Sequence, residues 1–297
     1  MNTEASFANP MGGLGQADGM IRYLARIGLA APPPATGEGL AVLQAAHRMA
    51  VAFENLDILL GRGIAVDSQS VFDKLVTRGR GGYCFEQNRL FSDVLSQIGI
   101  ANRPLLARVR LAVPPGVVPP RTHVCLLATV EGRHWLADAG FGGSNIPPLP
   151  LEDGAEAATP DGARHRLLRV GPPGLLAGEW RLERAGPAAA TDGRSEAHAD
   201  WQAQYTFDLS EVAPDDLEQA NHWTATRSGT RFTTLHVASI PIADGFAALS
   251  DRQLTIHRAA GTDRRTIDNP EDYAATLREV FRIALSDDEA ARLPLFA

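Results

Sequence analysis

The sequence predicts an α+β protein in which helices come first, antiparallel strands follow, and the last third mixes both types. Apolar residues recur at helical spacing through the opening third of the chain. Near residue 105 this pattern gives way to short apolar stretches separated by turns rich in proline and glycine. The closing stretch, "PEDYAATLREVFRIAL" at 270–285, is again amphipathic. We therefore expect a helical part, an antiparallel β part that forms a barrel, and a mixed part.

Three helices are predicted in the opening third. The first is "MIRYLARIGLA" at 20–30, which ends at the prolines that follow it. The second covers 36–53 with Thr36 as its N-cap, and it places His47 on its apolar face. A histidine in that position is usually a core residue with hydrogen-bond partners, so it is not assigned to catalysis. The third runs from Cys84 to Gln97, and Gly99 lies just past its end.

The later elements follow from the change of period. Five strands are predicted at 105–113, 122–130, 134–141, 179–185 and 203–209. The polar segment 151–164 between them is predicted to be a surface loop. In the last third, a helix begins at Pro214, strands cover 231–240 and 252–259, and a helix closes the chain at 270–285.

Composition excludes several function classes. The chain has 297 residues, 44% apolar and 21% charged, with a net charge of −7. No apolar run reaches membrane-spanning length, and no basic run indicates nucleic-acid binding. Neither a zinc-type Cys/His pattern nor a phosphate-binding glycine motif occurs, so no metal is expected. The start lacks a secretory pattern, which predicts a cytoplasmic protein with reduced thiols; the acidic surface fits a monomer or a homodimer.

Cys84 lies in "RGRGGYCFEQN", directly after a double glycine and at the start of a predicted helix. The positive end of the helix dipole and the free N–H groups of the first turn favour a thiolate there. Gly81 and Gly82 would give a substrate carbonyl close access to the sulfur. Most free cysteines, however, are small buried hydrophobes. A basic side chain near Cys84 is therefore needed to decide whether it is a nucleophile or a core residue.

Partners are found in "RTHVCLLATVEGRHWLADAGFGG". If Glu131 and Gly132 form a two-residue hairpin loop, His123 and Asp138 lie diagonally adjacent on one face of the sheet. A three-residue loop would send Asp138 to the opposite face. The pair would let Cys84 attack an acyl carbon, with His123 as base and Asp138 as the group that orients the ring. The other cysteine, Cys125, lies mid-strand and is predicted to pack in the core.

These residues resemble the arylamine N-acetyltransferase family, which uses acetyl-CoA to acetylate aromatic amines and hydrazines. The resemblance is carried by "FENLDILLGR", "RGGYCFEQN", "RTHVCL" and "LADAGFGG", with weaker similarity at 23–29 and 205–235. It implies a papain-like arrangement. A helical domain at 1–99 would carry the cysteine, a β-barrel domain at 100–208 the His and Asp, and an α/β lid would cover 209–297. The acetyl group would pass first to Cys84 and then to the amine.

The resemblance also implies two sets of binding residues. Thr122, Phe141 and Gly142 match positions near the pantetheine arm of the coenzyme. The apolar acceptor pocket carries over to a set of five positions, which are Phe53, Phe85, Val109, Phe141 and Phe232. Any one of these aromatic residues taken alone is better explained by plain core packing, and it is their combination with the three catalytic candidates that indicates a pocket.

The chain departs from the usual family pattern at Ala52, Ala139 and Arg227, which leaves acceptor preference open. The same three catalytic side chains also suit a related acyltransferase or amide synthase with a longer acyl donor. They equally suit a cysteine hydrolase whose acyl-enzyme is released by water. A ligand-binding protein without activity is the remaining alternative, and the intact trio argues against it.

Overall fold

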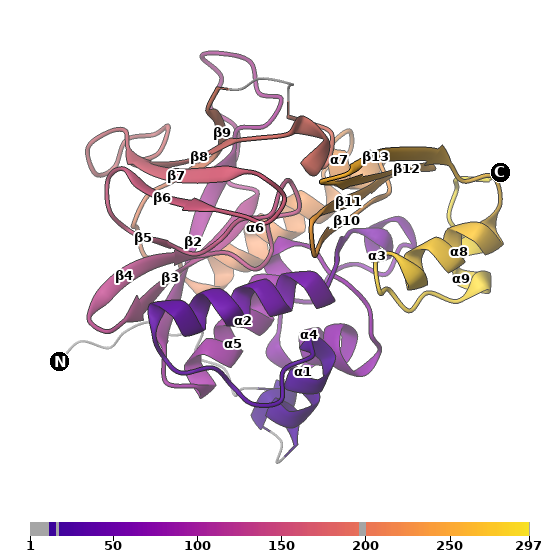
Figure 1. The fold of residues 1–297 in the computed structure, drawn as a ribbon, viewed down its shortest axis with the longest axis horizontal. Coiled ribbons are helices and arrows are strands. Elements are labelled where there is room, and N and C mark those ends of the chain that lie inside the picture. Colours follow the sequence, from indigo (N-terminus) through magenta and orange to yellow (C-terminus); the bar gives the residue numbers. More distant parts are fainter. Residues whose placement is uncertain (1–11, 16–17, 196–199, 297) are drawn as a thin grey trace.

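The computed structural model describes residues 12–15, 18–195 and 200–296, and it confirms the α+β class. Figure 1 shows helices α2 and α5 below a curved β-sheet, with a second, smaller sheet beside them. The residues on which the absence of a secretory signal was judged lie partly outside the described ranges. Among the described residues, no helix is long and apolar enough to cross a membrane.

The first third is helical, as predicted. Its longer helices are α1 (Gly19–Ile27), α2 (Gly37–Ala50) and α5 (Cys84–Gln97), and its shorter turns are η1 (Gly12–Gly15), α3 (Leu56–Leu59), α4 (Ser68–Phe72) and η2 (Asp73–Thr77). The predicted bounds of α5 are confirmed at both ends. The Thr36 hydroxyl caps α2 by accepting from the Gly39 N–H at 3.1 Å. Gly28 ends α1 in the left-handed conformation, with a φ of 75°.

The large sheet is an antiparallel, nearly closed barrel. Its strands are β2 (Ala101–Val109), β3 (His123–Val130), β4 (Arg133–Ala137), β5 (Leu149–Pro150), β6 (Ala155–Ala158), β7 (Arg164–Arg169), β8 (Trp180–Ala185) and β9 (Gln202–Phe207). Their order is β5-β4-β3-β2-β9-β8-β7-β6, and the edge strands β5 and β6 approach each other. The prediction of a surface loop at 151–164 is therefore wrong in part, because β6 pairs there with β7. The turn η3 (Ala188–Ala190) follows β8.

The small sheet combines a strand from the first third of the chain with four strands from the last third. It contains β1 (Phe53–Glu54), β10 (Val237–Ile242), β11 (Gly245–Ser250), β12 (Gln253–Arg258) and β13 (Gly261–Thr266), in that order. The short strand β1 pairs antiparallel with β10, and the Asn55 side chain accepts from the Val237 N–H at 2.9 Å. Residues from the beginning of the chain thus form the edge of a sheet built by its end.

Four helices complete the last third: α6 (Pro214–Thr226), α7 (Arg231–Thr234), α8 (Pro270–Glu279) and α9 (Asp287–Ala291). The helix predicted to begin at Pro214 is confirmed. The strand predicted at 231–240 is correct only from Val237, since its first residues form α7. The closing helix ends earlier than predicted, at Glu279.

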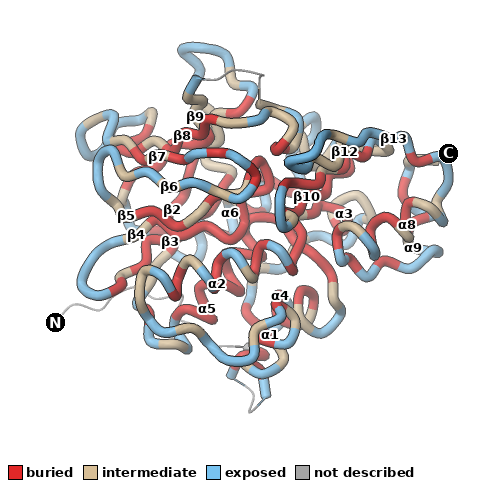
Figure 2. The backbone as a smooth tube through the Cα atoms, in the orientation of Figure 1, coloured by how far each residue is buried: buried red, intermediate tan, exposed pale blue. Residues whose placement is uncertain are grey.

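Helix α5 lies at the centre of the molecule, and every residue from Cys84 to Leu95 is buried. Figure 2 shows this burial continuing from the helices into the central strands of the barrel. The apolar side of α5, including Phe91 and Leu95, packs with α1, α2 and the outer face of β3 in one core cluster. A helix enclosed in this way places its first residue deep inside the protein, where the neighbouring side chains decide its chemistry.

Candidate active site

Cys84 is the first residue of α5 and is 2% exposed. The Glu86 carboxylate accepts from the Tyr83 N–H at 3.0 Å, so it caps the helix just before the cysteine. The preceding glycines are needed for close packing. A Cβ on Gly81 would lie 2.4 Å from the Ala52 carbonyl oxygen, and one on Gly82 would lie 2.9 Å from the Glu86 carboxylate. These contacts give the double glycine a structural reason beyond substrate access.

A buried network of charges supports this helix start. Lys74 Nζ lies 2.7 Å from a Glu86 oxygen and 2.9 Å from an Asp57 oxygen. Arg80 Nη2 lies 3.1 Å from both Glu54 and Asp57. All five groups are almost fully buried, so each charge depends on its partners. The network therefore fixes the backbone that carries the cysteine.

The β3–β4 hairpin has the register predicted from the two-residue loop. Val130 pairs with Arg133, and the ladder continues to Leu126 and Ala137. Glu131 and Gly132 have φ values of 51° and 74°, as a type I′ turn requires. The β3–β4 ladder ends at Leu126 and Ala137, before His123 and Asp138, yet the His123 Nε2 lies 2.7 Å from the Asp138 Oδ2. The prediction that the two side chains share one face is confirmed.

The hairpin lies directly against the start of α5. A Cβ on Gly140 would lie 2.8 Å from the Cys84 Cα, so only glycine allows this approach. The Cys84 Sγ also lies 3.7 Å from the carbonyl oxygen of Thr122, the residue before His123. The Cys84 thiol, the imidazole and the carboxylate thus lie together in one place.

The Asp138 carboxylate is fully buried and accepts four hydrogen bonds. Besides His123, its donors are the Asn88 amide, the Gly140 N–H and the Tyr205 hydroxyl, each at 3.0 Å. Burial raises the pKa of this carboxyl, but His123, Arg48 and Asn88 outweigh that effect and bring the pKa below its ordinary value. The carboxylate therefore stays ionised in a site closed to water.

His123 is buried between aromatic rings. The ring centroids of Phe141 and Tyr205 lie 5.2 Å and 4.9 Å from its own. Burial lowers the pKa of this imidazole, but Asp138 and the Cys84 side chain outweigh that effect and raise the pKa to about 9. An ionised carboxylate only accepts hydrogen bonds, so the His123 Nε2 carries the proton in the contact with Asp138. The other ring nitrogen, Nδ1, is the one available for proton transfer.

A cavity of about 240 Å³ opens onto Cys84 and His123. Its lining includes most of the predicted binding residues, namely Phe53, Val109, Thr122, Phe141, Gly142 and Phe232. Phe85 does not line it, because its ring is buried against Tyr83 at a centroid distance of 5.5 Å. Sequence reasoning did not identify Arg194, Trp223 and Arg231, which also line this cavity.

Comparisons with known proteins identify the family of the chain. A family model described as N-acetyltransferase matches residues 38–290. The arylamine N-acetyltransferase of Escherichia coli (strain K12) is 34% identical over 268 residues, which are 89% of this chain and 89% of that protein. The chain belongs to the arylamine N-acetyltransferase family. As a member of it, the protein is an acetyltransferase.

Solved structures of other family members share the fold. The Salmonella typhimurium enzyme superposes with a TM-score of 0.81 at 31% identity, covering 92% of this chain and 97% of that chain. The Mycobacterium marinum enzyme in complex with CoA gives a TM-score of 0.80 at 32% identity, covering 93% and 99%. These similarities confirm the fold that the family resemblance implied.

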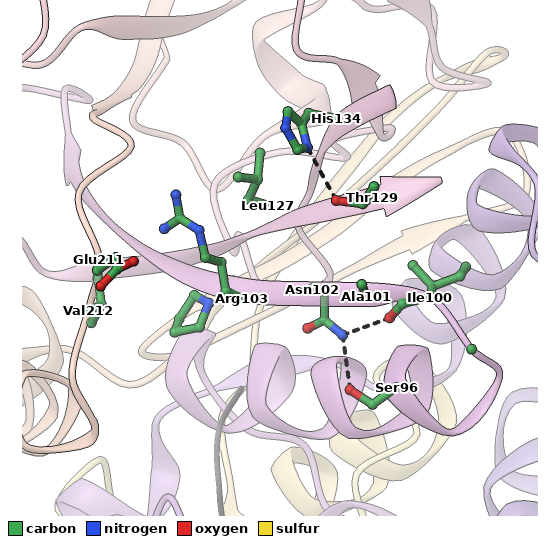
Figure 3. A pocket seen from close by; sticks show the side chains of 12 residues that line it. Ser96, Ile100, Ala101, Asn102, Arg103, Leu127, Thr129, His134, Glu211 and Val212 are labelled. Carbon is green, nitrogen blue, oxygen red and sulfur yellow. Dashed lines mark hydrogen bonds between the residues drawn. The ribbon is translucent and has the colours of Figure 1, made fainter. Parts of the chain in front are cut away.

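A second cavity, of about 420 Å³, shares no lining residue with the active-site cavity of this family member. Figure 3 shows it between the end of α5 and the strands β2 and β3. Its polar groups largely bond to one another: the Asn102 amide donates to Ser96, and Thr129 bonds to His134 at 3.2 Å. Although it is larger than the cavity at Cys84, no cysteine lines it.

The remaining polar candidates have structural roles. His47 bonds to Tyr23 at 2.9 Å and Gln87 at 3.2 Å, and burial lowers its pKa to about 3, which confirms a core histidine. Cys125 is fully buried, and burial raises the pKa of its thiol well above the usual value. In the part of the chain that the structure describes, no three His, Cys, Asp or Glu residues are grouped to bind a metal.

The departures from the family pattern lie in two different environments. Ala52 and Ala139 are buried, and the Ala139 N–H donates to Asn88 at 3.0 Å. Arg227 is exposed where α6 ends, with its carbonyl oxygen accepting from the Thr233 hydroxyl. The first two positions thus belong to the packing around the site, while Arg227 belongs to the surface.

Proposed function

We propose that this protein transfers an acetyl group from acetyl-CoA to the nitrogen of arylamines and arylhydrazines through an acetyl-Cys84 thioester. The observation that carries the proposal is the assembly of Cys84, His123 and Asp138 at one end of an apolar cavity. The CoA complex of the Mycobacterium marinum relative supports CoA as the carrier of the acyl group. The reaction then proceeds in two half-reactions.

In the first half-reaction, the Cys84 thiolate attacks the thioester carbonyl of acetyl-CoA. With a pKa of about 9, His123 is protonated at neutral pH and pairs with the thiolate. When the tetrahedral intermediate collapses, the bond from carbon to the CoA sulfur breaks, and the His123 proton passes to that sulfur. Free CoA leaves, and the enzyme holds an acetyl group on sulfur beside a neutral imidazole.

In the second half-reaction, the neutral amine attacks the acetyl-Cys84 carbonyl. His123 takes the proton that the nitrogen loses, and the bond from carbon to the Cys84 sulfur breaks. The products are the N-acetylated amine and the original pair of thiolate and imidazolium, so protons and charge balance over the cycle. Asp138 stays ionised throughout, because four hydrogen bonds stabilise its negative charge and the imidazolium adds to them whenever His123 is protonated.

The cavity suits a flat aromatic acceptor. The rings of Phe53 and Phe232 lie 5.8 Å apart on its wall, and Val109 and Phe141 add apolar surface. A Cβ on Gly142 would lie 2.5 Å from the Phe53 ring, so a side chain there would collide with that wall. We assign Thr122, Phe141 and Gly142 to the pantetheine arm and the apolar residues to the acceptor ring.

The test is the intact mass of the protein after mixing with acetyl-CoA in the absence of an acceptor. Wild type should gain one acetyl group and lose it when an arylamine is added, while Cys84→Ala should gain none. Cys125→Ala is the matched control and should behave like wild type, because Cys125 is sealed in the barrel core. Acylation of Cys84→Ala would refute the assignment of the nucleophile.

Other outcomes separate the two competing activities. An adduct that forms only with a longer acyl-CoA would identify an acyltransferase or amide synthase with another donor. An adduct that disappears in buffer as fast as with an amine would identify a hydrolase. The thioester of a transferase should instead persist until the amine is added.

The remaining proposals concern the whole chain. We divide it into a helical domain (1–99), a barrel domain (100–208) and a lid (209–297); both divisions fall between observed elements, after α5 and after β9. A cytoplasmic location, the absence of nucleic-acid and membrane partners, and a homodimer as an alternative to a monomer all stay predictions.

A further inference from the structure

Arg48 on α2 is buried to 4% exposure, and its hydrogen bonds within the described part of the chain all go to uncharged oxygens. Its Nη2 donates to the carbonyl oxygen of Phe141 at 2.8 Å and to that of Ser144 at 2.6 Å. Its Nη1 donates to the carbonyl oxygen of Asp138 at 3.1 Å, and its Nε reaches the Asn145 side chain at 3.4 Å. One side chain therefore contacts four residues of a single segment.

Gln44 lies one helical turn before Arg48 and contacts both ends of the same segment. Its carbonyl oxygen accepts from the Asp138 N–H at 2.9 Å, and its amide donates to the Ile146 carbonyl oxygen at 2.8 Å. Residues four apart on a helix share one face, so the two side chains act side by side. We refer to Gln44 and Arg48 together as the α2 clamp.

The segment they hold, residues 138–146, needs external support. It follows β4, and among the described residues its one strand-type pairing is an isolated bridge from Ser144 to Thr191; it also contains three glycines in "DAGFGGSNI". Glycine leaves a chain with more conformational freedom than other residues do, so such a segment does not hold one shape by itself. Nevertheless it carries the Asp138 carboxylate at one end and the Phe141 ring of the cavity wall in its middle.

We propose that Gln44 and Arg48 are positioning residues, which hold segment 138–146 so that Asp138 meets His123 and Phe141 faces the acceptor. The inference rests on the proposed role of Cys84, His123 and Asp138. Neither Gln44 nor Arg48 lines the cavity at Cys84, so the clamp acts through the backbone that it holds. Its positive charge also lies near enough to Asp138 to favour the ionised carboxylate.

The test compares Arg48→Met, Arg48→Lys and Gln44→Leu with wild type, using the rate at which iodoacetamide alkylates Cys84. This rate measures how readily Cys84 reacts as a thiolate paired with protonated His123, and the reaction requires no acyl donor. Because a misplacement of about 1 Å in a reacting group costs on the order of 100-fold, we expect Arg48→Met to slow alkylation by about that factor. Arg48→Lys keeps the charge and some donors, so it should recover part of the rate.

Arg26→Met is the matched control. Arg26 also donates to two main-chain carbonyl oxygens, those of Leu75 and Arg282, but these lie outside the active site. The control should lower the melting temperature while the alkylation rate stays that of wild type. A second measurement is the low-field NMR signal of the His123 Nε2 proton, which should shift or disappear in Arg48→Met and persist in Arg26→Met.

A folded Arg48→Met protein with the alkylation rate and NMR signal of wild type would overturn the proposal. So would an equal loss of rate in Arg26→Met, which would show a general effect of stability. If Arg48→Met does not fold, Gln44→Leu decides by the same two measurements. If wild type takes no acetyl group from acetyl-CoA but its alkylation responds to the clamp as expected, the proposed donor is wrong and the clamp stands.

Discussion

Replacing Asp138 by asparagine tests the core of the site while keeping its shape. In wild type, Asn88 and Gly140 donate to Oδ1, and His123 and Tyr205 donate to Oδ2. The new amide oxygen can replace Oδ1, but the amide NH₂ then faces two groups that both donate. To form a bond, His123 must move its proton from Nε2 to Nδ1, which is the nitrogen that Cys84 needs.

The magnitude follows from the pKa of His123. Its rise from 6.5 to about 9 corresponds to roughly 3 kcal/mol of preference for the imidazolium. Without the carboxylate, burial keeps the imidazole neutral at pH 7 and the thiolate loses its partner. We expect the alkylation of Cys84 by iodoacetamide at pH 7 to slow by on the order of 100-fold or more.

The assay is the alkylation rate followed by intact mass from pH 5 to pH 10, with circular dichroism to verify folding. Asp93→Asn is the control. Asp93, on α5, is a buried carboxylate like Asp138, but it bonds to Ser68 at 2.6 Å and not to His123. It should lose stability and keep the alkylation rate. A folded Asp138→Asn protein with the wild-type rate and pH profile would refute the assigned role.

Three further predictions concern rate, stability and pH. Tyr205→Phe removes one of four hydrogen bonds to Asp138, so kcat should fall by about 3- to 10-fold, as loss of roughly 1 kcal/mol implies; an unchanged kcat would contradict this. Lys74→Met leaves Glu86 buried without its cation, so urea unfolding should show a loss of about 3–5 kcal/mol; an unchanged midpoint would count against the network. Because the pKa of His123 is raised to about 9, its contribution to stability is complete below pH 6.5 and is lost as pH rises through 9. Thermal unfolding should show this decline in wild type and a weaker one in Asp138→Asn.

Local signals predicted the parts of the site that lie close together in the sequence. The bounds of α5 followed from its apolar spacing, and the register of the β3–β4 hairpin followed from a two-residue loop. Asn88 was within reach of the same reasoning, since it lies one turn after Cys84 and faces the same way. Phe85 was misplaced because adjacent helical residues point about 100° apart, so its ring turns away from the cavity that Cys84 faces.

The rest of the site and of the fold depends on pairing between strands that are far apart in the sequence, which local patterns do not predict. Tyr205 reaches Asp138 only because β9 lies beside β2 in the barrel, and no local pattern gives that strand order. Strand β6, "AEAA", has low β propensity and is held at the sheet edge by its partner β7. The reverse applies to "RFTT", which has strand-like composition but turns as α7 under a capping hydrogen bond from the Thr230 N–H to Thr233.

The pairing of β1 with β10 has a consequence for how the protein is made in the cell. Asn55 and Val237, which are hydrogen-bonded in the finished molecule, are 182 residues apart in the chain. A ribosome that adds about 5 to 20 residues per second needs roughly 10 to 40 seconds to span that distance. During this interval the segment next to Phe53 has no β10 to pair with, and the cavity wall has no Phe232. The segment around Cys84 is thus made well before Phe232 and β10, and the wall of the cavity on which it opens is completed only after they have been added.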